Sequence, residues 1–176
     1  MRTVKLTQPD AWQQMPPMGT LREWITDRGS LTARIVGNFA DFNLVRLGQR
    51  LVVPLSDERR ALGLRRGELA VVREVVLRSG TTPLVFAHTV VNPRDLAGAW
   101  RGLSRLGSRP LAEMLFQDPL VSRMPIEYRK LRKGHALLRR GGIRSDAWAR
   151  RSVFLKYGQP LMVTEVFLPA AFTAAP

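Results

Sequence analysis

Nearly continuous runs of apolar residues, interrupted by a few polar ones, predict two adjacent β-strands in the middle of the chain, at residues 69–78 and 84–92. The SGTTP segment between them has the composition of a hairpin turn. A second hairpin is predicted near the C-terminal end, where residues 152–156 and 161–168 flank the sequence YGQP. Further extended segments are predicted at 39–53, before Pro54, and at 121–128.

Helical periodicity is weaker than the strand pattern and predicts short helices. Ser30 is a suitable N-cap for a helix over residues 31–36. Pro93 suits the first position of a longer helix over 93–106, whose apolar residues recur at helical spacing. The remaining predicted helices cover residues 20–27, 56–62 and 111–116.

Strands dominate this pattern and the helices are grouped between them, which favours an α+β fold with an antiparallel sheet. A chain of 176 residues is long enough for one domain with a substantial core. We expect this domain to span residues 19–170. An irregular N-terminal arm is expected at 1–18, and a frayed, low-complexity tail at 171–176.

The net charge of +14 invites a nucleic-acid-binding interpretation, because basic proteins bind phosphates through counterion release. The excess, however, comes from arginines spread along the chain. One dense block of basic residues lies at 129–151. Among tryptophan, tyrosine and phenylalanine, the side chains that commonly stack on bases, this block contains only Trp148. We therefore predict a solvated basic loop at 129–151 and no nucleic-acid partner. Its field would still attract a dianionic metabolite.

Composition also bears on the compartment. The chain contains no cysteine, which excludes disulfides and thiolate metal sites and fits a reducing compartment. The first twelve residues lack the apolar segment of a signal peptide. No stretch approaches the roughly 20 apolar residues that a membrane-spanning helix needs. We expect a cytoplasmic monomer without stable membrane insertion.

Motifs for common cofactors are absent: the sequence contains no GxGxxG, no GxxxxGK[ST] and no HExxH. Two histidines, His88 and His135, are far apart in sequence, so a zinc or transition-metal site is improbable. His135 is most simply a surface residue of the basic segment. His88 lies in a predicted strand, where a polar core position or a strand edge is favoured over a ligand role.

Arg73 and Glu165 each interrupt a predicted apolar strand. Read as a strand, 161–168 places Glu165 on the same face as its apolar neighbours, and Arg73 occupies an equivalent position in 69–78. Burying an unpaired carboxylate costs several kcal/mol or forces protonation. An acid and a guanidinium embedded in this way predict a small enclosed site for an anionic ligand. The alternative for each residue is a charge turned to solvent at a sheet edge.

The start of the predicted helix at 111–116 adds a possible third component. With Pro110 at the first helical position, the backbone N–H of Leu111 would be one of the unpaired donors at the helix N-terminus. Many helices begin this way with only water bound, so the feature is weak alone. Beside Arg73 it would complete a clamp for a carboxylate.

The order of several segments resembles the bacterial chorismate lyase (chorismate pyruvate-lyase) family over residues 21–170. These segments are LREWITDRGSLTARI, VVREVVL, AHTVVN, LGSRPLAEMLF and WARRSVFLKYGQPLMVTEVFLPA. The resemblance implies one α+β domain, with helices mainly on one side of a central antiparallel sheet and a buried site beneath flaps. It also implies cofactor-free cleavage of chorismate to 4-hydroxybenzoate and pyruvate, a step toward ubiquinone.

The resemblance assigns roles to four positions. Arg73 matches the arginine that holds the ring carboxylate, and Leu111 matches the residue whose N–H contacts the same group. Glu165 matches the glutamate near the ring hydroxyl and the leaving ether, and Leu31 stands where a pocket-lining methionine is expected. Two departures exist: His88 replaces a commoner arginine, and residues 130–148 are longer and more basic than usual.

A rival function is a sensor or carrier for small aromatic acids, because the same fold serves as the effector domain of a family of bacterial transcription regulators. Those regulators carry an N-terminal winged helix-turn-helix. About 20 residues precede the first matched helix here, which we expect to be too few for such a domain.

Overall fold

The computed structural model describes residues 11–13, 19, 21–168 and 172. Most of the arm predicted at 1–18, and all of the tail at 171–176 except Phe172, lie outside the described residues. Within the described part, Gln13 forms a single β-bridge with Tyr128. No described helix is long and apolar enough to cross a membrane.

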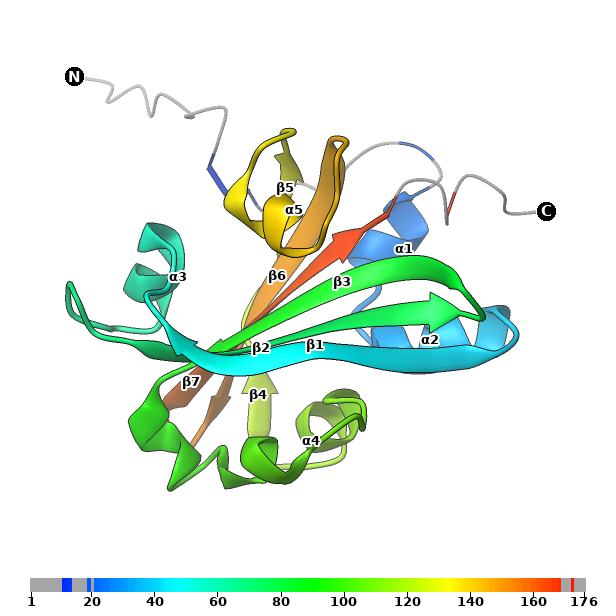
Figure 1. Ribbon diagram of the computed structural model, residues 1–176. Helices are drawn as coiled ribbons and strands as arrows, with labels where there is room; N and C mark the ends of the chain where they lie inside the picture. The colour runs from blue at the N-terminus through cyan, green and yellow to red at the C-terminus, as the bar shows by residue number, and fades with distance from the viewer. Residues whose placement is uncertain (1–10, 14–18, 20, 169–171, 173–176) are drawn as a thin grey trace, which may run out of the picture.

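A seven-stranded antiparallel sheet forms the centre of the molecule (Figure 1), which confirms the predicted α+β class. The strand order is β1-β2-β3-β7-β6-β4, and β5 pairs with β6 beside β4. The strands are β1 Phe42–Val52, β2 Ala70–Ser79, β3 Thr82–Val91, β4 Val121–Arg123, β5 Glu127–Leu131, β6 Ala147–Lys156 and β7 Gln159–Phe167.

Both predicted hairpins are confirmed, with tighter turns than the sequence suggested. Only Gly80 and Thr81 separate β2 from β3. The turn between β6 and β7 consists of Tyr157 and Gly158, whose φ values are +52° and +76°. Two positive φ values in succession match the twist of the flanking strands, as in a type I′ turn. Glycine adopts this backbone without strain.

The strand register fixes which side chains share a face. Arg73 on β2 lies opposite Thr89 on β3, and Thr89 lies opposite Val163 on β7. Glu165 on β7 lies between Ala87 on β3 and Arg150 on β6. Because side chains alternate along a strand, these positions all point to one face of the sheet, which we call the cavity face.

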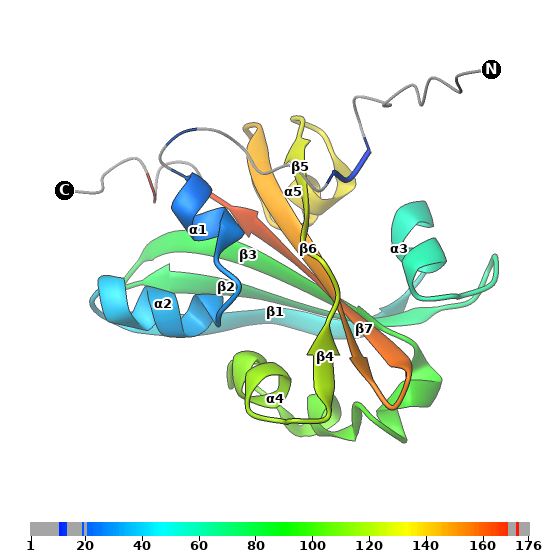
Figure 2. The same cartoon turned by 180° about the vertical axis from the view of Figure 1, so that it is seen from behind.

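Most of the helices cover the cavity face (Figure 2). They are α1 Arg22–Thr26, α2 Leu31–Asn38, α4 Ala112–Phe116 and two 3₁₀ helices, η1 Pro93–Leu96 and η2 Arg101–Arg105. The opposite face is also covered, by Leu62 and Leu64 at the end of α3 Ser56–Ala61 and by Leu137 and Leu138 of α5 Ala136–Arg140. Apolar side chains are therefore buried on both sides of the sheet.

The prediction of one helix over 93–106 is wrong, because this segment forms η1 and η2 with a turn between them. Glycines at 98 and 102 lower the helical propensity of the segment, and the backbone forms i+3 bonds such as that from Leu103 N–H to the carbonyl of Trp100. The predicted apolar stripe is nevertheless mostly buried, since Trp100 and Leu103 are fully enclosed.

Residues 121–131 also differ from the expected single strand over 121–128. They form β4 and β5, both paired with β6, with Met124, Pro125 and Ile126 between them. Pro125 has no N–H to donate, which favours an interruption at this edge of the sheet.

The solvated loop expected at 129–151 is likewise wrong. This segment contains the end of β5, all of α5 and the first half of β6. Several of its arginines bind acids from elsewhere in the chain: Arg140 lies 3.5 Å from Glu74, and Arg151 lies 2.6 Å from Glu127. Both of these acids lie outside residues 129–151, so the composition of that segment alone does not reveal them.

Candidate active site

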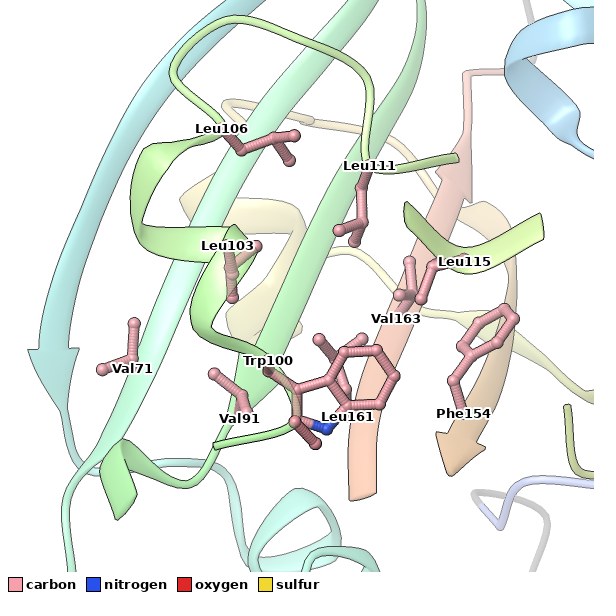
Figure 3. Packing of buried hydrophobic residues seen from close by; sticks show 11 residues of the cluster. Val71, Val91, Trp100, Leu103, Leu106, Leu111, Leu115, Phe154, Leu161 and Val163 are labelled. Carbon is pink, nitrogen blue, oxygen red and sulfur yellow. The ribbon is translucent and has the colours of Figure 1, made fainter. Parts of the chain in front are cut away.

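A cavity with about 570 Å³ of empty volume lies between the cavity face of the sheet and the segments of α2 and α4. The structure brings all four sequence-predicted residues, Leu31, Arg73, Leu111 and Glu165, together in its wall. Figure 3 shows Leu111 and Leu115 directed towards Val163 on β7, with Phe154 alongside.

Arg73 supplies an isolated buried cation. Its side chain is almost completely buried, and its Nη2 donates to the carbonyls of Gly107 at 3.2 Å and Arg109 at 3.0 Å. No described residue accepts from its Nε, and no described carboxylate forms an ion pair with it. Burial, and then the positive charge of Arg46, lower the pKa of Arg73 to about 10. A guanidinium in this state is well prepared to bind a carboxylate.

The two leucines stand at the starts of helices. Leu31 is the first residue of α2, and Ser30 caps that helix as predicted, with its Oγ accepting from the N–H of Ala33 at 3.1 Å. Leu111 precedes α4 as its N-cap rather than being its second residue, which corrects the sequence-based placement. Both leucines are buried and contribute apolar wall to the cavity.

Glu165 is not the unpaired carboxylate that the sequence suggested. Its Oε2 accepts from Nε of Arg150 at 2.5 Å, and its side chain retains 17% exposure toward the cavity. Arg150 is 1% exposed, and its Nη1 also donates to the carbonyl of Asp27 at 2.6 Å. The ion pair therefore ties the glutamate to the end of α1.

Sequence reasoning missed two arginines at this site, Arg150 and Arg123. Arg150 was assigned to a solvated loop, although extending the strand back to residue 147 would have placed it on the same face as Ser152 and Phe154. Arg123 stands in the three-residue strand β4 and lines the cavity. Three residues are too few for an alternation of apolar and polar side chains to reveal a strand.

His88 lies on the opposite face, away from the cavity. It is completely buried, with Nδ1 3.0 Å from Oε1 of Glu74 and Nε2 3.0 Å from Oε1 of Glu58. Burial alone would lower its pKa, but the hydrogen bonds and charges of the two glutamates raise the pKa above its usual value. His88 is thus a paired core residue, in agreement with the polar-core alternative.

His135 is an N-cap rather than a simple surface residue, because its Nδ1 accepts from the N–H of Leu137 at 3.2 Å. Burial, followed by the charge of Arg129, lowers the pKa of His135. Within the described part of the chain, no group of three or more His, Cys, Asp or Glu side chains is arranged to hold a metal ion.

Comparison with known proteins identifies the family, and it is the one that the sequence resembles. The profile of the family described as Chorismate lyase matches residues 2–175. A probable chorismate pyruvate-lyase of Nitrosomonas europaea is 45% identical over 174 residues, which cover 95% of this chain and 98% of the relative. A probable chorismate pyruvate-lyase of Cupriavidus metallidurans is 47% identical over 161 residues, covering 88% and 75%.

Solved structures show how widely the fold is shared. The ligand-binding domain of a GntR-family regulator from Bordetella bronchiseptica has a TM-score of 0.54 and 19% identity, covering 76% of this chain and 86% of that one. The PhnF C-terminal domain has a TM-score of 0.57 and 17% identity, covering 74% and 84%. At such identities the likeness concerns the fold alone. By its sequence over nearly its whole length, the chain belongs to the chorismate lyase family.

Proposed function

We propose that this protein is a chorismate lyase, which cleaves chorismate to 4-hydroxybenzoate and pyruvate without a cofactor. Family membership and the names of its relatives support this function. The observation that carries it is the buried, unneutralised guanidinium of Arg73, which shares a cavity with Glu165. The cavity thus offers an anion-binding group and a carboxylate to one small ligand.

In this proposal Arg73 binds the ring carboxylate of chorismate, and the backbone N–H of Leu111 donates to the same group. A guanidinium matches a carboxylate with two parallel hydrogen bonds. Such a pair is stronger in a site from which water is excluded. Leu31 packs against the ring from the start of α2.

The reaction breaks the C–O bond between the ring and the enolpyruvyl group. A proton leaves the ring carbon that carries the hydroxyl, and the ring becomes aromatic. The departing enolpyruvate takes up a proton at its methylene carbon and becomes pyruvate, so the atoms balance without an oxidant or reductant. Because aromatisation drives the reaction, the protein needs chiefly to orient the substrate and to stabilise charge at the breaking bond.

Glu165 is the proposed group at the hydroxyl and ether end of the ring. Its carboxylate exposes one side to the cavity while Arg150 binds the other. From this position it accepts a hydrogen bond from the ring hydroxyl or transfers a proton during elimination. The ion pair with Arg150 fixes the carboxylate, which favours a single orientation of the substrate.

The same proposal extends to the pathway, the compartment, the oligomeric state and the partners of the protein. The product feeds ubiquinone synthesis, and the protein acts as a cytoplasmic monomer with chorismate and 4-hydroxybenzoate as its partners. A nucleic-acid partner is not proposed, since many arginines of the basic block are used in internal ion pairs.

The test is to incubate the purified protein with chorismate and to measure 4-hydroxybenzoate and pyruvate. Release of both in equal amounts supports the proposal. Tight binding of 4-hydroxybenzoate with chorismate left intact would instead indicate a sensor or carrier, the function of this fold in transcription regulators.

A further inference from the structure

Arg123 is a second cation in the wall of the cavity. It lies on β4 opposite Phe154 of β6, and it shares the cavity with Arg73 and Glu165. The basic character of the chain gave no reason to select it. Its surroundings, however, differ from those of an arginine on the surface.

The side chain is held firmly by neutral groups. Nε donates to Oγ of Ser152 at 2.8 Å, and Nη1 donates to the carbonyl of Arg28 at 2.9 Å. Its guanidinium carbon lies 5.3 Å from the ring centroid of Phe154 and 5.7 Å from that of Phe116. These contacts orient the guanidinium by hydrogen bonds and cation–π attraction.

None of these partners neutralises the charge of Arg123. No described carboxylate forms an ion pair with it, and the nearest acid of the cavity, Glu165, is already paired with Arg150. Burial, and then the charge of Arg150, lower the pKa of Arg123 to about 10, although the carboxylates of Glu165 and Asp27 act in the opposite direction. Described residues accept from two of the five N–H donors of this guanidinium, which leaves three for a ligand, including both on Nη2.

The cavity therefore carries two unneutralised guanidinium groups, at Arg73 and Arg123. A ligand with two carboxylates would balance them, whereas a monoanion would leave one unpaired. If the protein acts as proposed above, its substrate is a dianion and its aromatic product is a monoanion.

We infer that Arg123 binds the carboxylate of the enolpyruvyl side chain of the substrate, while Arg73 binds the ring carboxylate. This inference rests on the proposed function. Arg123 then selects the substrate over 4-hydroxybenzoate, which has lost the second carboxylate. It also stabilises negative charge on the departing enolpyruvate as the C–O bond breaks.

The test compares two ligands that differ in the second carboxylate. The variant Arg123→Met removes the charge and keeps apolar bulk over the two phenylalanine rings. The ligands are 4-hydroxybenzoate and 3-(carboxymethoxy)-4-hydroxybenzoate, a stable dianion with its second carboxylate beside the hydroxyl. Dissociation constants are measured by calorimetry, and kcat/KM is measured for chorismate.

We expect Arg123→Met to weaken the dianion and to lower kcat/KM for chorismate by about 10- to 100-fold each, because one charge-assisted contact is lost. The dissociation constant of 4-hydroxybenzoate should change by less than about threefold. Should Arg123→Met fail to fold, Arg123→Lys serves instead. It keeps a cation but loses the planar fork, so the dianion should again weaken more than the monoanion.

Arg34→Gln is the matched control. Arg34 holds the same connection between α1 and α2 as Arg123 does, through the carbonyl of Glu23 and the carboxylate of Asp27, but it does not line the cavity. We expect both ligands and kcat/KM to remain near wild-type values in this variant.

Equal weakening of both ligands by Arg123→Met, or unchanged binding of the dianion, would overturn the inference. A wild-type protein that leaves chorismate intact contradicts the proposed function instead, and the two ligands still report separately on the second carboxylate site.

Discussion

Replacing Glu165 by glutamine separates the two roles that the structure gives this residue, one in the reaction and one in the fold. Glutamine keeps the volume and one hydrogen-bond acceptor, but it cannot transfer a carboxyl proton or neutralise Arg150. The sequence alone suggested an unpaired carboxylate, for which a neutral replacement would stabilise the fold. The ion pair with Arg150 reverses that expectation.

The size of the stability effect follows from the burial of the pair. Arg150 is 1% exposed and Glu165 is 17% exposed, at an N–O distance of 2.5 Å. Breaking a buried pair by removing one partner costs about 3–5 kcal/mol. The amide oxygen of glutamine still accepts from Nε, and Glu165 is partly solvated, so we expect a loss of roughly 1–3 kcal/mol. For a domain of this size, Tm should fall by roughly 3–10 °C.

Turnover is measured well below the lowered Tm, so that the variant is fully folded. If Glu165 transfers a proton, kcat should fall by roughly 10²–10⁴-fold, the usual range for general acid–base catalysis. The dissociation constant of 4-hydroxybenzoate should change little, because the amide can hydrogen-bond the phenol.

A second ion pair provides the control. Glu127 accepts from Nε of Arg151 at 2.6 Å on the opposite face of the sheet, remote from the cavity. Glu127→Gln should lower Tm by a smaller amount, because Glu127 is 34% exposed, and should leave kcat unchanged. A lowered Tm with near-wild-type kcat in Glu165→Gln would refute the catalytic role, and an unchanged or raised Tm would refute the ion-pair argument.

Three further predictions concern other parts of the molecule. Arg73→Ala should weaken 4-hydroxybenzoate binding in calorimetry by about 2–5 kcal/mol while circular dichroism shows an intact fold, and an unchanged dissociation constant would exclude Arg73 from the site. The pKa of His88 is raised in the folded state, so its contribution to stability is complete below about pH 6.5 and is lost as the pH rises through the folded-state pKa. Tm should therefore fall more between pH 6 and pH 9 in the wild type than in His88→Gln. An equal fall of Tm in the two proteins would contradict this prediction. Cleavage of chorismate should persist in excess EDTA, whereas loss of activity that a divalent ion restores would point to a metal that we do not expect.

The central strands were predictable because their evidence is local. Alternation within residues 69–78 and 161–168 placed Arg73 and Glu165 on defined faces, and the register then brought those faces together. The helix expected over 93–106 failed because its apolar spacing is helical while its glycines favour tighter turns. Apolar periodicity predicts which side chains are buried more reliably than it predicts the type of helix or turn that carries them.

The partners of buried charges were not predictable, because they lie far apart in sequence. Glu165 is paired from β6, and its partner Arg150 reaches the carbonyl of Asp27, 123 residues earlier. Asp146 is the only acid within residues 129–151, so the local sequence alone predicts solvated arginines. Whether a charged side chain on a strand is neutralised or available for a ligand depends on ion pairs with residues far away in sequence.

Strand alternation divides the charges of this protein between the two faces of the sheet. Adjacent residues such as Arg150 and Arg151 point in opposite directions, so a run of like charge is separated rather than concentrated. On the opposite face, four basic groups have acids within ion-pair distance: His88, Arg50 and Arg140 with Glu58 or Glu74, and Arg151 with Asp57 and Glu127. On the cavity face, Glu165 is the only described acid that lines the cavity, and it pairs with Arg150, so neither Arg73 nor Arg123 has an ion pair of its own among the described residues. The net charge of +14 therefore carries little information by itself. The functional signal is a local deficit of carboxylates inside one cavity, which a dianionic substrate would fill.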